Sequence, residues 1–350
     1  MGIGTAKKLA VLGMALMCLY LLFMGQLRKT VETAVEAGRM KNVEIVVPSA
    51  APAPEETPAE ASPETDSAAE ADAGTISLRL PEESEAPLSQ PEDNRNLEQI
   101  QETTISGGLS IKNETSYDID VSGMLSEGSQ VRLPAGEPQI LIVHTHSSEA
   151  YTPAGLDRYE ASDTNRTEDK EYNIVRVGDE LTALLQLAGL NVIHDREIYD
   201  YPSYTGSYER SGAAVQSYLE QYPSIAVVID MHRDALGANG VVYKTMAEES
   251  GVCASQVMLL VGTDDSGLYH PNWRSNLSLA LYLQNAVSAV HPTLMRPVAL
   301  VQQRYNQHLT GGSLILEVGS SGNTLQEALA AIRLFADAAA PALLALVEEV

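Results

Sequence analysis

Hydrophobic positions divide the chain into an apolar N-terminal run, a polar middle and a C-terminal part with regular periodicity. Residues 9–25, LAVLGMALMCLYLLFMG, carry no charge and have two basic residues on each side. This length is close to the shortest stretch that spans about 30 Å of hydrocarbon. Because no small-x-small cleavage site directly follows the run, we predict an uncleaved transmembrane anchor over 1–30 rather than a signal peptide.

The middle of the chain has the composition of a spacer. From 51 to about 94 the residues are mainly Ala, Pro, Glu, Ser, Thr and Asp. Such a stretch has too few large apolar side chains to offset the entropy lost on ordering. We therefore predict that 31–106 form a short juxtamembrane segment followed by a disordered acidic linker, which its own charges keep extended.

From 107 onward, short apolar runs alternate with segments that have helical spacing. Apolar runs predict strands, and apolar positions three and four residues apart predict helices. The expected strands are 140–143, 191–195, 224–234, 252–263 and 313–321, and the expected helices are 172–190, 207–223, 273–290 and one from Thr324. This alternation predicts one α/β domain over 107–350, with a mostly parallel sheet and helices on both faces.

Charge restricts the partners of this chain. Lys and Arg total 22 against 47 Asp and Glu, which gives a formal net charge of −25. Proteins that bind nucleic acid use Lys and Arg to displace the counterions of the phosphate backbone. We therefore expect no nucleic-acid partner.

Three of the expected strands end in groups that bind metals or transfer protons. The apolar run ILIV at 140–143 leads into HTHSSE, the run AVVI at 226–229 leads into DMHRD, and the run SLIL at 313–316 leads into EVG. The carboxyl ends of parallel strands meet at one edge of a sheet, where ligands and metals gather. The coincidence of three such strand ends predicts a site at this edge.

The residue types favour catalytic zinc. Such a zinc ion takes three His or carboxylate ligands and leaves one position for water, whose pKa then falls to about 7. We assign His146, Glu149 and His232 as the ligands of one zinc ion per chain. Glu317, at the third strand end, is the candidate that carries a proton from water to the leaving nitrogen.

Several neighbouring residues have alternative interpretations. His144 competes with His146 as a ligand, because alternate residues of a strand share a face, and would otherwise support the reaction from nearby. Asp230 is placed to orient His232 or to form a turn. Arg233 and Arg304 either neutralise a substrate carboxylate or oxyanion, or form ion pairs within this acidic domain.

At these residues the chain resembles the stage II sporulation protein P family of endospore-forming bacteria. The matching stretches cover nearly all of 137–350 and are ILIVHTHSSEAY, SYERS followed by VVIDMHRD, WRSNLSLA, RYNQHL and LILEVGSSGNTLQEAL. That family is similar to zinc N-acetylmuramoyl-L-alanine amidases, in which a Glu-x-Gly strand end similar to Glu317-Val-Gly319 supplies the catalytic carboxylate. The H-x-x-E spacing followed by a distant His also resembles zinc carboxypeptidases.

The resemblance implies an amidase and endopeptidase that degrades septal peptidoglycan during engulfment. It further implies a place in the mother-cell membrane with the catalytic domain outside the cytoplasm, and cooperation with stage II sporulation proteins D and M. The zinc-binding Glu of the amidases lies further beyond the first His than Glu149 does. Glu168 or Glu171 is therefore an alternative to Glu149.

Two other functions compete with peptidoglycan hydrolysis. One is a metallocarboxypeptidase that acts on ordinary peptides, and the other is a non-catalytic wall-binding scaffold of the sporulation machinery. Metal content distinguishes the scaffold from the enzymes, and the products released from peptidoglycan distinguish the two enzymes.

Overall fold

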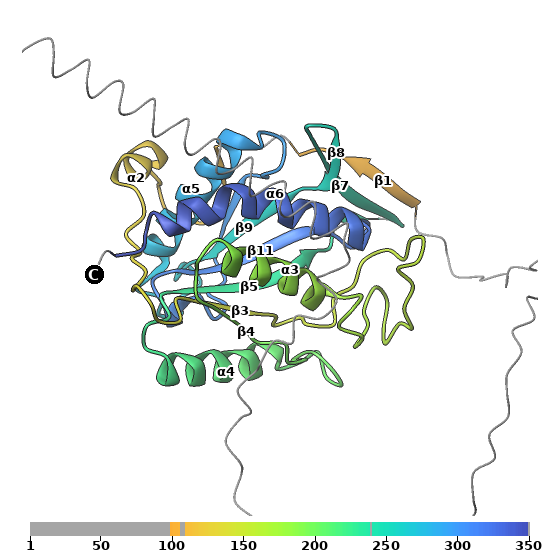
Figure 1. Ribbon diagram of the computed structural model, residues 1–350, viewed down its shortest axis with the longest axis horizontal. Helices are drawn as coiled ribbons and strands as arrows, with labels where there is room; N and C mark the ends of the chain where they lie inside the picture. Colours follow the sequence, from red (N-terminus) through yellow and green to blue (C-terminus); the bar gives the residue numbers. More distant parts are fainter. Residues whose placement is uncertain (1–98, 106–108, 239, 349–350) are drawn as a thin grey trace, which may run out of the picture. The chain divides into compact units, whose positions relative to one another are not determined.

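The computed structural model describes residues 99–105, 109–238 and 240–348 (Figure 1). In this part of the chain the main sheet has seven strands in the order β2-β10-β9-β11-β5-β3-β4. From one edge to the other they are β2 (Ile111–Asn113), β10 (Val298–Val301), β9 (Val257–Gly262), β11 (Ser313–Ser320), β5 (Val227–Asp234), β3 (Ile140–Val143) and β4 (Val192–His194).

The sheet consists of two parallel halves that run in opposite directions. Neighbouring strands are parallel except β11 and β9, which pair antiparallel. The fold is therefore a mixed α/β fold, in agreement with the predicted class. β4, β3, β5 and β11 all send their carboxyl ends to the same edge, and the three strand ends singled out in the sequence belong to this half.

Side chains that alternate along the strands enter two different cores. Ile140 and Ile142 of β3 belong to the large core formed with α3 (Ile174–Leu187), α5 (Trp273–Val290) and α6 (Leu325–Leu344). Leu141 and Val143 face the other way, toward Val215 of α4 (Ser207–Gln221). Helices therefore cover both faces, as predicted, with α3 and α6 side by side on one of them (Figure 1).

The helices begin at residues that cap them. The Asn173 side chain accepts a hydrogen bond from the Val175 amide at the start of α3 (3.0 Å). At the start of α6, Thr324 and Glu327 form a reciprocal capping box, which satisfies backbone donors that the helix itself leaves free. The last helix, predicted from Thr324, thus begins one residue later, at Leu325, and Thr324 caps it.

A smaller sheet differs from the sequence prediction. It contains β1 (Gln99–Thr103), β7 (Val241–Glu249), β6 (Gly237–Ala238) and β8 (Val252–Ser255), and a short helix, α2 (Val121–Glu127), precedes β3. β1 pairs with β7, although the predicted boundary at 107 assigned it to the linker. The run 252–263 was predicted as one strand, but the chain moves at Gln256 from β8 in the smaller sheet to β9 in the main sheet.

The predicted anchor and most of the predicted linker lie outside the described residues. Within the described ranges, no helix is both long enough and apolar enough to cross a membrane.

Candidate metal centre

His146, Glu149 and His232 converge at the carboxyl edge of β3 and β5. His146 Nδ1 lies 3.5 Å from Glu149 Oε1, and His232 Nδ1 lies 3.5 Å from Glu149 Oε2. The three potential ligand atoms lie within 4.8 Å of one another. The structure thus brings together the three residues that the sequence assigned to zinc.

Local structure explains this convergence. β5 extends past Asp230 and carries His232 on the face that α4 covers, since Met231 between them enters the other core. β3 ends at Val143, and a turn closed by the bond from the Glu149 amide to the His146 carbonyl (3.1 Å) reverses the chain. This turn lets His146 and Glu149 approach His232 from the neighbouring strand.

The chemistry of these donors fits zinc. Ligand atoms about 2.0–2.1 Å from a tetrahedral zinc ion are separated by about 3.4 Å. With one ligand atom from each residue, the three atoms lie within 4.8 Å of one another, so side-chain movements of about 1 Å would bring them to this spacing. Two imidazoles and one carboxylate also leave a tetrahedral ion one open position, as catalytic sites require. Glu168 and Glu171, the alternative ligands, are exposed and lie outside the cluster.

Asp230 holds the imidazole of His232. Its Oδ1 lies 3.0 Å from His232 Nε2, which leaves Nδ1 facing Glu149. Thr145 donates to the same carboxylate from its amide (2.8 Å) and from its hydroxyl (2.6 Å). Metal-binding histidines commonly have such a partner on the other ring nitrogen, which fixes the ring orientation.

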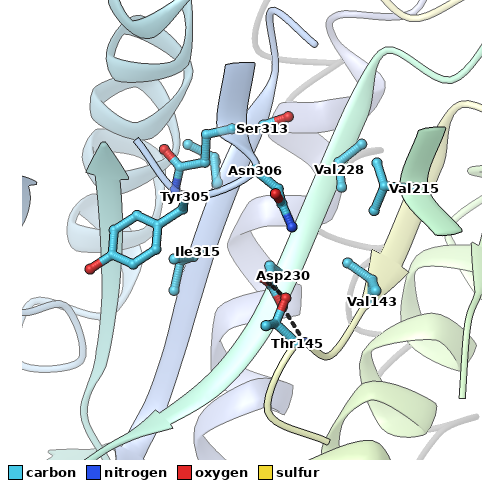
Figure 2. A pocket seen from close by; sticks show the side chains of 11 residues that line it. Val143, Thr145, Val215, Val228, Asp230, Tyr305, Asn306, Ser313 and Ile315 are labelled. Atoms are coloured by element: carbon cyan, nitrogen blue, oxygen red, sulfur yellow. Dashed lines mark hydrogen bonds between the residues drawn. The ribbon is translucent and has the colours of Figure 1, made fainter. Parts of the chain in front are cut away.

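A small pocket adjoins Asp230 rather than the three ligands. Figure 2 shows Asp230 and Thr145 at one end, with Val143 and Ile315 of the neighbouring strands and Asn306 of a loop around them. None of the three potential zinc ligands lines it. The pocket is therefore not the space in which a zinc ion held by these three residues would lie.

The charges at the site are strongly coupled. Burial alone would raise the pKa of Glu149, but Arg233 and the imidazoles of His146 and His232 hold it well below its usual value. Burial alone would lower the pKa of His232, but Asp230 and Glu149 raise it well above the usual value. In the metal-free protein His232 is therefore an imidazolium between two carboxylates.

Glu317 lies next to this cluster on β11. Its backbone pairs in register with His232, and the side chain is half-buried with Oε2 lacking a hydrogen-bond partner among the described residues. Burial raises the pKa of Glu317 to about 8, although the charge of His232 opposes the change. Gly319 then turns the chain with a φ of 67°, and a Cβ there would lie 2.9 Å from the Ser255 side chain.

His144 does not join the cluster. Its Nδ1 lies 3.2 Å from the Met231 carbonyl oxygen, and its Nε2 lies 2.7 Å from His194 Nε2. The ring continues the row of Ile140 and Ile142 and packs against Gly178 of α3. Both nitrogens are occupied on that side of the sheet, so this arrangement does not support a role for His144 in binding zinc or substrate.

The guanidinium groups of both predicted arginines donate to backbone carbonyl oxygens. The buried Arg233 guanidinium donates to the carbonyl oxygens of Ala150 and Asn165 (2.9 Å each). Its amide donates to Glu149 Oε2 (3.1 Å), so Arg233 fixes the loops and the ligand carboxylate. Arg304 donates to the Tyr269 carbonyl (3.2 Å) in the loop before α5.

Sequence reasoning missed the residues that surround the ligands. Arg166 pairs with Glu149 (3.4 Å) and with Asp200. The Tyr204 ring stacks on His146 at 4.6 Å, beneath the Arg166 guanidinium. Tyr208 lies close to both histidines, and burial raises the pKa of its hydroxyl. No spacing indicated Arg166 or Tyr204, because both lie in long loops, whereas Tyr208 lies in the SYERS stretch.

Comparison with known proteins identifies the family. The family model of stage II sporulation protein P matches residues 35–340. Stage II sporulation protein P of Bacillus subtilis (strain 168) is 27% identical over 209 residues, which are 57% of this chain and 49% of that protein. The match thus spans about half the length of the relative.

The main domain also has remote structural likenesses. N-acetylmuramoyl-L-alanine amidase AmiC2 of Nostoc punctiforme is 14% identical with a TM-score of 0.34, over 59% of this chain and 96% of that chain. The CwlD amidase from Clostridioides difficile, solved in complex with the GerS lipoprotein, is 14% identical with a TM-score of 0.35, over 59% and 94%. Since the family model matches most of the sequence, the chain belongs to the stage II sporulation protein P family.

Proposed function

We propose that this protein is a zinc-dependent hydrolase that cleaves amide bonds in the peptide part of peptidoglycan. The observation that carries the proposal is the convergence of His146, Glu149 and His232 beside Glu317 at one edge of the sheet. Membership of the stage II sporulation protein P family supports the choice of peptidoglycan as substrate.

The residues around the site have distinct roles in this reaction. A zinc ion held by His146, Glu149 and His232 would polarise the amide carbonyl and lower the pKa of water. Glu317 takes a proton from the attacking water while the water oxygen bonds to the carbonyl carbon. Glu317 then gives this proton to the nitrogen as the C–N bond breaks, which leaves one new amine and one new carboxylic acid, whose remaining proton passes to solvent or to the amine at neutral pH.

A carboxyl group whose pKa lies near the working pH is suited to this exchange. A group that must both accept and release a proton works best when neither form is strongly favoured. The pKa of Glu317 is raised to about 8 by burial in the metal-free protein, and the charge of zinc would lower it. Asp230 and Arg233 support the reaction by fixing two of the ligands.

We also propose where the enzyme acts. The apolar run at 9–25 supports an anchor in the mother-cell membrane, with the catalytic domain outside the cytoplasm. Family membership supports action on the septal wall during engulfment, together with stage II sporulation proteins D and M.

Zinc content and product analysis of the purified full-length protein test the proposal. The wild type should hold one zinc per chain and release matched new amines and carboxylates from purified peptidoglycan, which mass spectrometry assigns to one amide. His232→Ala should lose both zinc and hydrolysis. His291→Ala is the control, because His291 pairs with Asp337 away from the site and should change neither.

Other outcomes would contradict specific parts of the proposal. Full zinc occupancy in His232→Ala would remove His232 from the ligand set. A wild type that binds no metal would indicate a scaffold, and one that trims free peptides but leaves peptidoglycan intact would indicate a carboxypeptidase.

A further inference from the structure

Two tyrosines from separate sequence motifs meet beside the candidate metal centre. Tyr208, of the SYERS stretch, lies in the first turn of α4, and Tyr305, of the RYNQ stretch, lies in the loop after β10. Their ring centroids are 5.3 Å apart, at an interplanar angle of 40°. The roles assigned above to the ligands and to Glu317 do not involve either tyrosine.

Tyr208 borders both histidines of the ligand set. Its ring lies edge-on to His146, with centroids 5.3 Å apart, and nearly parallel to His232 at 6.5 Å. Glu317 and Glu149 both lie within electrostatic range of its hydroxyl. Among the described residues, this hydroxyl has no hydrogen-bond partner.

Two tyrosines that are not adjacent to both histidines have paired hydroxyls. The Tyr151 hydroxyl donates to the Val318 carbonyl (3.0 Å), and the Tyr282 hydroxyl donates to the Ala342 carbonyl (3.0 Å). The Tyr208 side chain is half-buried and its hydroxyl is not among the fully buried unpaired atoms, so it can bond to water until a ligand replaces that water. An unpaired hydroxyl beside the ligands is therefore available to a molecule that enters the site.

The loop that carries Tyr305 is fixed firmly against α4. The Asn306 side-chain amide donates to the Tyr208 carbonyl (2.8 Å) and to the Ser211 hydroxyl (3.1 Å). Gln307 accepts from the Gly262 amide (2.7 Å). Tyr305 itself has a φ of 51°, a left-handed conformation that a bulky residue adopts only when its surroundings hold it there. Figure 2 shows its ring and the Asn306 side chain leaving the loop in opposite directions.

We propose that the Tyr208 hydroxyl donates a hydrogen bond to the oxygen of the scissile amide as negative charge develops there, and that Tyr305 positions the Tyr208 ring. This inference rests on the proposed hydrolase function. A tyrosine hydroxyl remains protonated at neutral pH, because its ordinary pKa is about 10, and so it can donate. Removal of one such donor typically lowers kcat by about 10²–10³-fold.

Tyr208→Phe in the full-length zinc-loaded protein tests the donor. We expect kcat on soluble muropeptides to fall about 10²–10³-fold, with KM and zinc content unchanged. Binding of a phosphinic analogue, in which PO₂–CH₂ replaces the amide that the wild type cleaves, should weaken by a similar factor in calorimetry. The control is Tyr218→Phe, which removes a hydroxyl from the same helix away from the ligands and should change none of these quantities.

The positioning role of Tyr305 depends on its ring and not on its hydroxyl. Tyr305→Ala should lower kcat and weaken binding of the phosphinic analogue, and Tyr305→Phe should restore most of both, because Phe keeps the ring contact with Tyr208.

Three results would overturn the inference. The first is a Tyr208→Phe protein with wild-type kcat and wild-type affinity for the phosphinic analogue. The second is a Tyr208→Phe protein that has lost its zinc, which would make Tyr208 a support of the ligands. The third, a wild type that neither binds zinc nor cleaves muropeptides, would overturn the proposed function as well and is thereby distinguished from the first two.

Discussion

Glu317 provides a test in which activity and stability should change in opposite directions. In the metal-free protein, burial raises the pKa of this carboxyl from 4.5 to about 8. Between these values the folded chain binds one more proton at Glu317 than the unfolded chain does. The free energy of unfolding therefore decreases as the pH rises through this range.

The size of this effect follows from the two pKa values. At pH 7 the unfolded carboxyl is ionised and the folded one is mostly protonated, which costs about 3 kcal/mol at about 1.4 kcal/mol per pH unit. This figure is an upper value, because part of the Glu317 side chain touches solvent. Glu317→Gln removes the titrating group, so the zinc-free variant should be more stable than the wild type by about 1–3 kcal/mol at pH 7. Near pH 4.5 the difference should nearly vanish.

Urea unfolding of the zinc-free protein measures this difference. Trp273 is the only tryptophan of the chain, is buried and stacks on Tyr117, so its fluorescence should report unfolding. Glu327→Gln is the control of opposite sign. Its carboxylate pairs with Lys244 and caps α6, which lowers its pKa despite burial, so its removal should destabilise the protein.

The catalytic consequence of the same substitution is loss of activity. Glu317→Gln should retain zinc but lose about 10²–10⁴-fold in hydrolysis of peptidoglycan, the usual contribution of a positioned proton carrier. A correctly folded Gln variant that is less stable than the wild type at pH 7 would refute the electrostatic reasoning. A Gln variant that loses zinc would make Glu317 a ligand, and one that keeps full activity would exclude it as the proton carrier.

Three further predictions concern the surroundings of the ligands. Asp230→Asn should lower zinc affinity about 10–100-fold with the fold retained, because the His232 ring loses the charged partner that fixes its orientation. An unchanged affinity in a competition titration with a chelator would contradict this. Zinc binding should release the proton that Asp230 and Glu149 hold on His232, so calorimetry in buffers of different ionisation enthalpy should detect proton release at pH 7. Burial and His194 lower the pKa of His144 to about 3, whereas the unfolded chain binds a proton at this residue near pH 6.5, so acid favours the unfolded wild type. His144→Gln lacks this group, and its free energy of unfolding relative to the wild type should therefore rise by about 1 kcal/mol from pH 7 to pH 5.5 in urea unfolding. A difference that stays constant with pH would refute this prediction.

The sequence was sufficient for the four long helices, for the strands that carry the site and for the proximity of its three potential ligands, because all of these depend on short-range patterns. The segment 273–290 was predicted as a helix and is α5 with the same bounds. His146 and Glu149 follow β3 and His232 lies near the end of β5, and the parallel arrangement of these strands could be inferred from the alternation with helices. The choice between His144 and His146 was harder, because strict alternation places both on one face. The chain turns after Val143, and only the structure shows that this turn separates them.

Contacts between distant loops could not be predicted in this way. Arg166 reaches Glu149 because residues on both sides of it fold back onto the turn after β3, as the bridge between Glu149 and Arg166 shows. Asp200, its second partner, comes from a third loop. No periodicity encodes such an approach, and one arginine in a polar loop is indistinguishable from its neighbours in the sequence.

The reversed half of the sheet explains why Arg304 and Tyr305, adjacent in sequence, have such different places. A fully parallel sheet would send the carboxyl end of β10 to the edge that carries the ligands, where Arg304 could meet substrate. β9 is instead antiparallel to β11, and β10 runs with β9, so the chain leaves β10 at the opposite edge. Arg304 remains there, bonded to the loop before α5. Tyr305 adopts a left-handed backbone, and its ring meets Tyr208 beside the ligands. The antiparallel pairing of β9 with β11 thus places Arg304 away from the ligands. Tyr305, with its left-handed backbone, is then the residue of this loop whose ring contacts Tyr208.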